Sequence, residues 1–217
     1  MEHSTLSMEQ MSAHCSTGLQ IGITPFVRVP YRCGEGFVQK VLDAGALGVV
    51  FPHVHSKTDA EAAVSISKYP PFGKRSVTGQ LPIFQLKPTP TERIIAETNE
   101  SGSSVILMIE TREGVEKVEE IATVPGVEVL LVGSNDLSID LGVPAQWKST
   151  EFRSALETIS KACKKHGKVM GLAGIYEDPE FHSWAINGLG VGFILGQQDS
   201  GLLARSAKEV SKALQDI

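Results

Sequence analysis

The chain alternates between short apolar runs and longer amphipathic ones. The short runs are rich in Val, Ile and Leu and lack a strict apolar–polar alternation, which is typical of parallel strands covered on both faces. Six such runs predict strands at Pro25–Val29, Gly48–Val54, Ser104–Ile109, Val127–Val132, Val169–Ile175 and Gly192–Leu195.

Apolar residues at helical spacing occupy much of the sequence between these runs. Val115, Val118 and Ile121, for example, fall on one stripe of a helix. The proline-rich segment Tyr69–Pro90 is instead predicted as a long loop with a functional or interface role. The predicted helices are Gly36–Ala44, Thr58–Ser67, Arg112–Ala122, Glu151–His166, Pro179–Asn187 and Gly201–Leu214.

A repeated strand–helix unit with short turns predicts right-handed crossovers and a parallel sheet. The pattern fits both an open doubly wound sheet and a (β/α)8 barrel. No GxGxxG or GxxxxGK[ST] motif follows the first strand, and polar residues end several strands, which favours the barrel. We therefore expect one α/β domain over residues 1–217, of the (β/α)8 TIM-barrel type, with about six of the eight barrel strands present.

Composition excludes several classes of partner. A net charge of -5 argues against nucleic acid, because a phosphate-binding surface needs a basic excess. No apolar run reaches the roughly 18 residues that a membrane span needs, and no secretory signal pattern is visible at the N-terminus. Three widely spaced cysteines fit reduced thiols. We therefore expect a cytoplasmic protein.

Two acidic residues follow neighbouring predicted strands. Glu110 comes directly after the strand that ends at Ile109, and Asp136 follows the next strand by way of a Gly-Ser-Asn turn. In a barrel these carboxylates would converge at the mouth and could hold a hard divalent cation such as Mg²⁺ or Mn²⁺. The alternative is that each carboxylate caps the helix that follows it.

Three further features could place charge or hydrogen bonds at the same mouth. Arg28 ends an apolar strand and could bind a carboxylate or an enolate oxygen, or could form a structural ion pair with a mouth acid. His53 and His55 are spaced for metal ligation or are solvated loop residues. Near a predicted helix start, backbone N–H groups could bind a carboxylate. These groups belong to Gly133, Ser134, Asn135 and Asp136.

Seven stretches in order along nearly the whole chain carry a likeness to a known family. They are Glu2–His3, Val27–Pro30, Leu42–Ala46, Lys68–Arg75, Ile109–Glu113, Val132–Ser138 and Leu202–Arg205. With these stretches the chain resembles the HpcH/HpaI aldolase family, the metal-dependent class II pyruvate aldolases of the phosphoenolpyruvate/pyruvate-barrel superfamily. Macrophomate synthase-like enzymes are relatives of that family.

The resemblance implies roles for individual residues. Glu110 and Asp136 would be the protein ligands of Mg²⁺ or Mn²⁺. Arg28 would contact the keto oxygen and stabilise an enolate, and His3 would be the catalytic histidine that moves a proton. Backbone groups of residues 133–136 would hold the carboxylate of a small 2-oxo acid such as pyruvate or oxaloacetate.

The resemblance also implies a reaction. It would be the cleavage of 4-hydroxy-2-oxo acids to pyruvate and an aldehyde through a pyruvate enolate, without a lysine Schiff base. One alternative is an oxaloacetate decarboxylase or macrophomate synthase-like enzyme working through the same enolate. Another is a non-catalytic, truncated paralogue that acts as an oligomeric pseudo-enzyme.

This sequence departs from the family pattern at two places. Family members carry a strand, a helix and a second strand ahead of the Glu2–His3 pair, so the resemblance predicts that residues 1–217 form an N-terminally truncated barrel domain. Met108 stands where several relatives have glutamine. The resemblance further implies a homo-oligomer, with a hexamer as the family's usual form, in which the last helix, here Gly201–Leu214, is exchanged between subunits.

Overall fold

A single six-stranded parallel sheet organises the protein, whose computed structural model describes residues 1–215. Each strand pairs with its neighbours along the chain, in the order β1 to β6, so the sheet forms a half-barrel of the TIM-barrel type. All six predicted strands are confirmed, with ends within three residues of those expected. The strands are β1 Phe26–Arg28, β2 Gly48–Phe51, β3 Ser104–Ile109, β4 Val129–Gly133, β5 Val169–Ala173 and β6 Val191–Ile194.

Most helices also lie where the apolar spacing predicts them. These are α2 Glu35–Asp43, α3 Lys57–Ser67, α8 Thr150–His166 and α10 Asp199–Gln215. The expected helix over 112–122 is broken at Lys117 into α5 Arg112–Glu116 and α6 Val118–Ala122. The expected helix over 179–187 is α9 Pro179–Ser183, continued by the π-helix Trp184–Leu189 (η2).

Two long helices were not predicted from the sequence, α1 Met8–Gln20 and α4 Thr91–Ser101. Each buries only two residues, Met11 and Cys15 in α1 and Ile94 and Thr98 in α4. The start of α1 is fixed by Ser7, whose hydroxyl accepts a hydrogen bond from the Gln10 amide while the Gln10 side chain bonds the Ser7 amide. The predicted loop 69–90 contains one short 3-10 turn, Pro82–Phe84 (η1).

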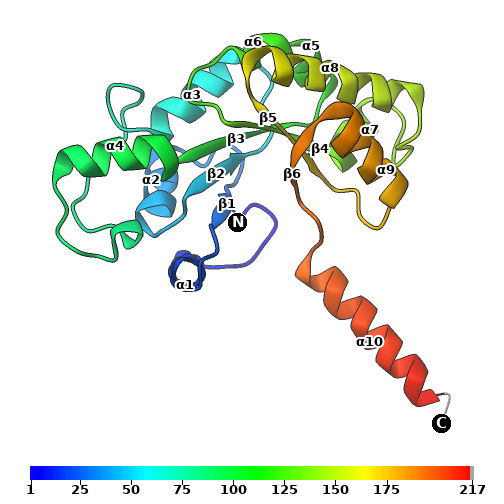
Figure 1. The fold of residues 1–217 in the computed structure, drawn as a ribbon, viewed down its shortest axis with the longest axis horizontal. Helices are drawn as coiled ribbons and strands as arrows, with labels where there is room; N and C mark the ends of the chain where they lie inside the picture. Colours follow the sequence, from blue (N-terminus) through cyan, green and yellow to red (C-terminus); the bar gives the residue numbers. More distant parts are fainter. Residues whose placement is uncertain (216–217) are drawn as a thin grey trace.

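Helices α3, α5, α6 and α8 lie along one side of the sheet (Figure 1). Alternate residues of each strand therefore serve two different cores. On β3, Leu107 and Ile109 join the large core that α8 covers, whereas Ile106 and Met108 join a smaller cluster with Leu131 on the other face.

The sheet curves strongly enough to bring its first and last strands together. The rings of Phe26 on β1 and Phe193 on β6 lie 5.9 Å apart, centre to centre, in an edge-to-face arrangement. The carboxyl ends of all six strands therefore surround a common region, which is where a barrel places its active site.

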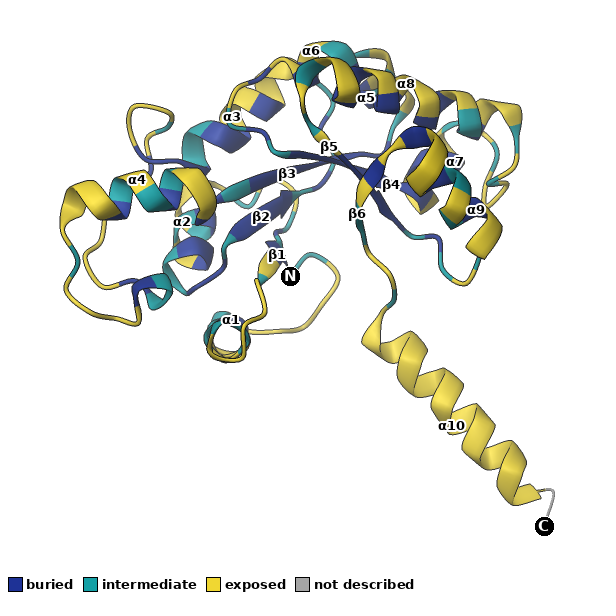
Figure 2. Ribbon diagram, viewed as in Figure 1, coloured by how far each residue is buried: buried dark blue, intermediate teal, exposed yellow. Residues whose placement is uncertain are grey.

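Helix α10 is the exception to this compact arrangement. It extends away from the rest of the protein, and none of its residues is buried (Figures 1 and 2). No helix within residues 1–215 has both the length and the apolar character needed to cross a membrane.

The packing of α8 gives a test of the fold. Replacing Leu156, which has no exposed surface, by alanine should lower the free energy of unfolding by about 2–5 kcal/mol, because it leaves a cavity under the helix. The matched change Glu157→Ala, on the exposed face of the same helix, should alter it by less than about 0.5 kcal/mol. Urea unfolding measures both, and equal losses would show that α8 is not packed as described.

Candidate active site

Three of the residues selected from the sequence end neighbouring parts of the sheet. Arg28 is the last residue of β1, Glu110 follows β3 directly, and Gly133 ends β4. The pairing of β3 with β4 sets Ile109 opposite Val132, which brings Glu110 beside Gly133. The expected convergence of these residues at the carboxyl edge of the sheet is therefore observed for this set.

Glu110 is a buried carboxylate with one satisfied oxygen and one unsatisfied oxygen. Its residue is 1% exposed. Oε1 accepts a hydrogen bond from the His53 amide at 2.6 Å and lies 3.1 Å from His53 Nδ1. Oε2 is buried without a hydrogen-bond partner among the described residues. A buried, unpartnered carboxylate oxygen is unfavourable unless a cation or donor reaches it.

The surroundings of Glu110 include groups that raise the pKa of its carboxyl and groups that lower it. Burial is the main cause that raises the pKa of Glu110 above its usual range, and the negative charge of nearby Asp136 raises it further. The His53 amide, the His53 ring and the Arg28 guanidinium act in the opposite direction. A second cation at this position would favour the ionised carboxylate.

Glycine at position 133 leaves the room that Glu110 occupies. A Cβ atom there would lie 2.5 Å from Glu110 Oε2 and 2.9 Å from Glu110 Cβ. Both distances are too short for any side chain, so the position of the carboxylate depends on this glycine.

Arg28 is held by a glutamate that the sequence analysis did not select. Its Nε donates to Glu2 Oε2 at 2.6 Å, and its Nη2 lies 3.3 Å from His3 Nε2. Glu2 Oε1 in turn lies 3.8 Å from His53 Nε2. The ion pair considered for Arg28 thus exists, but its partner is Glu2 rather than one of the two expected acids. The Glu2–His3 pair was a visible signal, although only the histidine was given a role.

His3 reaches the site from the start of the chain and stays open to solvent. Its side chain is 74% exposed and lies 3.7 Å from Glu2 Oε2. The structure therefore places the exposed ring of His3 beside the Arg28 guanidinium.

His53 is a contact residue of this site and not the solvated bystander that a loop histidine often is. It adopts a left-handed backbone conformation (φ 53°), which is rare for a residue with a side chain. That conformation directs both its amide and its ring at Glu110. His55 differs, because its Nδ1 lies 3.1 Å from the Thr111 hydroxyl and it has no contact with Glu110.

The segment 133–136 leads from β4 into helix α7, Ser134–Asp140. Asp136 stands exposed in the first turn of α7, and Ser134 is buried with no hydrogen-bond partner for its hydroxyl among the described residues. Amides in a first helical turn lack partners within the helix. The first turn of α7, which was predicted to bind a carboxylate, therefore begins directly after Gly133, the neighbour of Glu110.

The chemistry of these donors fits a divalent cation. Glu110 contributes an oxygen that has no other partner, and Asp136 lies close enough for its charge to act on Glu110. Carboxylate oxygens are the ligands that Mg²⁺ and Mn²⁺ prefer. Among residues 1–215 no group of three or more histidine, cysteine, aspartate and glutamate side chains is arranged to hold a metal. A cation here would therefore rely on few protein ligands and leave positions for substrate.

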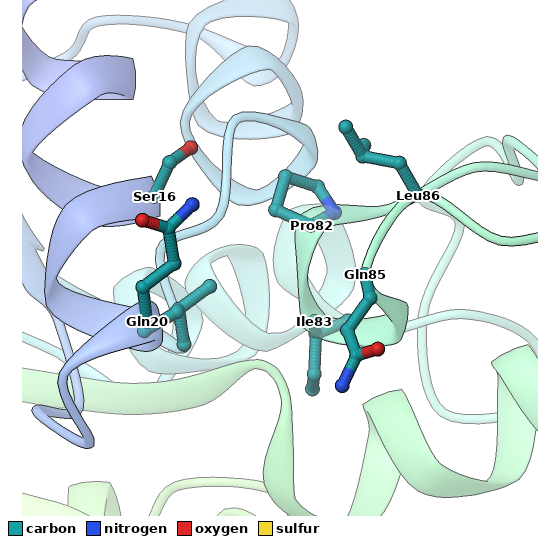
Figure 3. A pocket seen from close by; sticks show the side chains of 7 residues that line it. Ser16, Gln20, Pro82, Ile83, Gln85 and Leu86 are labelled. Carbon is teal, nitrogen blue, oxygen red and sulfur yellow. The ribbon is translucent and has the colours of Figure 1, made fainter.

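A cavity away from Glu110 has no acidic or basic residue in its wall. It has a volume of about 500 Å³ and lies between α1 and the 3-10 turn, with Ser16, Gln20, Pro82, Ile83, Gln85 and Leu86 around it (Figure 3). Pro82 packs against Gly45, ahead of the amino end of β2. This cavity is therefore at the opposite end of the sheet from Glu110.

A parallel half-barrel with carboxylates, an arginine and histidines at the carboxyl ends of its strands defines a TIM-barrel-like enzyme. The family model of the HpcH/HpaI aldolase/citrate lyase family matches residues 1–197. The chain belongs to this family, as the seven sequence stretches predicted.

Curated relatives and solved structures agree with this membership. A 4-hydroxy-4-methyl-2-oxoglutarate aldolase of Chaetomium globosum is 52% identical over 217 residues, which cover 100% of this chain and 81% of the relative. An aldolase of the same description from Hapsidospora irregularis is 51% identical, with 100% and 80% covered. The HpcH/HpaI aldolase of Desulfitobacterium hafniense DCB-2 superposes with a TM-score of 0.91 at 27% identity, covering 100% of this chain and 82% of that one. The expected carbon–carbon lyase of the aldolase type is thereby confirmed.

The glycine beside Glu110 provides a test of this geometry. The change Gly133→Ala should lower the free energy of unfolding by about 1–3 kcal/mol, because the added carbon overlaps the buried carboxylate. The control Gly36→Ala, in helix α2 with open space around its Cβ position, should instead be neutral or stabilising by up to about 1 kcal/mol. Urea unfolding of both variants would contradict the geometry if Gly133→Ala behaved like the control.

Proposed function

We propose that this protein is a divalent-metal-dependent aldolase that cleaves 4-hydroxy-2-oxo acids to pyruvate and a second carbonyl compound. The observation that carries the proposal is the unpartnered, buried Oε2 of Glu110 at the carboxyl edge of the sheet, the same edge at which Arg28 ends β1. The substrate of its two relatives, 4-hydroxy-4-methyl-2-oxoglutarate, is a member of this class. We assign it to this chain as the leading candidate substrate.

Glu110 and Asp136 would hold the cation, with Mg²⁺ and Mn²⁺ as the candidates. A divalent ion bound there would supply Lewis acidity to the 2-oxo group of the substrate. The backbone N–H groups of Ser134, Asn135 and Asp136 would orient the substrate's carboxylate next to it.

Arg28 would stabilise the negative charge that develops on the 2-oxo oxygen. Its guanidinium is held in one orientation, because Glu2 accepts from Nε at 2.6 Å and His3 Nε2 lies 3.3 Å from Nη2, which leaves Nη1 for another partner. A donor that is fixed before the reaction needs little rearrangement in the transition state. Glu2 thus acts as a positioning residue.

His3 would take the proton from the 4-hydroxyl group and return a proton to carbon later. Loss of the hydroxyl proton lets the C3–C4 bond break, so that C4 becomes a carbonyl carbon and the electron pair stays on the C1–C3 fragment as the enolate of pyruvate. Protonation of that enolate at C3 releases pyruvate. With 4-hydroxy-4-methyl-2-oxoglutarate the C4 fragment is a second pyruvate.

Helix α10 supports the proposal of a homo-oligomer with exchange of this helix, a hexamer being the family's usual form. Its exposed apolar residues Leu203, Val210 and Leu214 fall on one stripe, and they stay exposed among residues 1–215. A second copy of the chain would bury this stripe.

The acids should be essential for the reaction. We expect Glu110→Gln and Asp136→Asn each to lower Mn²⁺-dependent pyruvate release from 4-hydroxy-4-methyl-2-oxoglutarate by about 100-fold or more, because each removes a charged ligand. A chelator should silence the unmodified enzyme. Glu116→Gln, on the exposed face of α5, is the matched control and should retain activity.

A folded protein that binds Mn²⁺ yet releases pyruvate from no 4-hydroxy-2-oxo acid would contradict the proposed function. Pyruvate release from oxaloacetate alone would instead favour the decarboxylase alternative. Silence with every substrate would favour the pseudo-enzyme.

The apolar stripe of α10 should hold the assembly together. The double variant Leu203→Asp/Val210→Asp should give a smaller particle by light scattering than the unmodified protein, because it places charge in a desolvated contact. Lys212→Asp, on the opposite side of the helix, should leave the mass of the particle unchanged. A monomeric unmodified protein would show that α10 needs another explanation.

A further inference from the structure

A second cavity of about 170 Å³ lies directly beside the site, between the loop after β1 and the loop after β2. His53 forms part of its wall, so the cavity shares a residue with the surroundings of Glu110. The rest of the wall is mostly apolar and includes Pro30, Phe51, Val54, Ala63 and Ile66. The proposed catalytic roles leave this cavity unused.

Arg32 lines this cavity and forms no ion pair with a carboxylate among residues 1–215. The guanidinium carbon lies 4.9 Å from the centre of the Tyr31 ring, over its face. Within residues 1–215, no carboxylate forms an ion pair with Arg32 and no hydrogen bond holds its side chain. An arginine that stacks on an aromatic ring keeps its N–H fork free for a carboxylate.

A continuous series of contacts joins Arg32 to the reacting region. The rings of Tyr31 and His53 form an edge-to-face pair, with 5.1 Å between ring centres. His53 Nδ1 in turn lies 3.1 Å from Glu110 Oε1. Arg32 is also only four positions beyond Arg28 in the chain. Both arginines therefore belong to the end of β1, Arg28 as its last residue and Arg32 in the loop that follows.

Of the arginine and the aspartate that line the cavity, Arg32 is the one whose side chain has no hydrogen-bond or ion-pair partner among residues 1–215. Asp59 is its one acidic lining residue, and Asp59 Oδ2 already accepts from the His55 amide at 3.0 Å and from the Ser56 hydroxyl at 2.8 Å. Arg32 is thus a free cation next to an apolar wall. This combination suits a small group that carries a carboxylate on one side and a methyl or hydrogen on the other.

We propose that this cavity binds the half of the substrate that leaves when the C3–C4 bond breaks, with Arg32 binding the carboxylate on C4. The inference rests on the proposed function and narrows its substrate class. The preferred substrates are 4-hydroxy-2-oxo acids with a second carboxylate on C4, so cleavage yields a second 2-oxo acid rather than a simple aldehyde. Arg32 is then the specificity-determining residue.

Two substrates that differ in a single group test this assignment. In the presence of Mn²⁺, 4-hydroxy-2-oxoglutarate gives pyruvate and glyoxylate, whereas 4-hydroxy-2-oxopentanoate gives pyruvate and acetaldehyde, with a methyl group in place of the C4 carboxylate. Both are measured by pyruvate release with the full chain, as kcat/KM. The unmodified enzyme should prefer the first substrate.

The change Arg32→Ala should lower kcat/KM for 4-hydroxy-2-oxoglutarate by about tenfold to hundredfold, the range for losing a charged hydrogen-bond partner. Its effect on 4-hydroxy-2-oxopentanoate should be at least about tenfold smaller, since that substrate has no carboxylate to lose. Arg32→Lys should restore part of the preference, because it returns the charge without the fork. Lys40→Ala removes an exposed cation from helix α2 and should change neither value.

Equal losses for both substrates, or no loss for either, would overturn the role of Arg32 while leaving the proposed aldolase intact. Absence of pyruvate from both substrates with the unmodified, folded enzyme would overturn the proposed function and this inference together. The two failures are therefore distinguishable.

Discussion

A carboxylate removed from water needs a positive or hydrogen-bonding partner for each of its oxygens, and Glu110 is 1% exposed. The surrounding structure answers this requirement for only one oxygen, through the left-handed turn at His53. The other oxygen is left bare against Gly133, where a larger residue would displace it. The arrangement of the site follows from this difference between the two oxygens of Glu110. The oxygen that has no partner in the protein is available to a ligand.

The same electrostatic requirement extends outward through Glu2. This second carboxylate bonds Arg28 and faces His53, so two glutamates alternate with an arginine and a histidine from the start of the chain to the end of β3. Such a network keeps Arg28 oriented without neutralising Glu110. Substrate charge can then be met by groups whose positions are already fixed.

The fold was largely predictable because a parallel strand that is buried on both faces consists of an uninterrupted run of apolar residues. Residues 104–109 and 129–133 are clear examples. Their register then places Glu110 beside Gly133, so this part of the site was predictable as well. Helices α1 and α4 were missed, and their large aliphatic residues are few: Ile94 and Ile95 in α4, and Leu19 with two methionines in α1. The contact of His53 with Glu110 could not be foreseen, since it depends on a backbone angle that sequence pattern does not encode. The pairing of Arg28 with Glu2, 26 positions apart, likewise depends on tertiary structure.

The two outer strands of the sheet have a bearing on how the protein behaves at high concentration. Among the described residues β1 pairs only with β2 and β6 only with β5, so each presents backbone groups along one side. An exposed strand of this kind is a template for amyloid-like addition of other chains. Here β1 has three residues and β6 has four, β1 ends in the charged Arg28, and the Met1 amino group already donates to the Arg28 carbonyl. The brevity of both strands leaves little template for runaway polymerisation and still exposes the side chains that the chemistry requires.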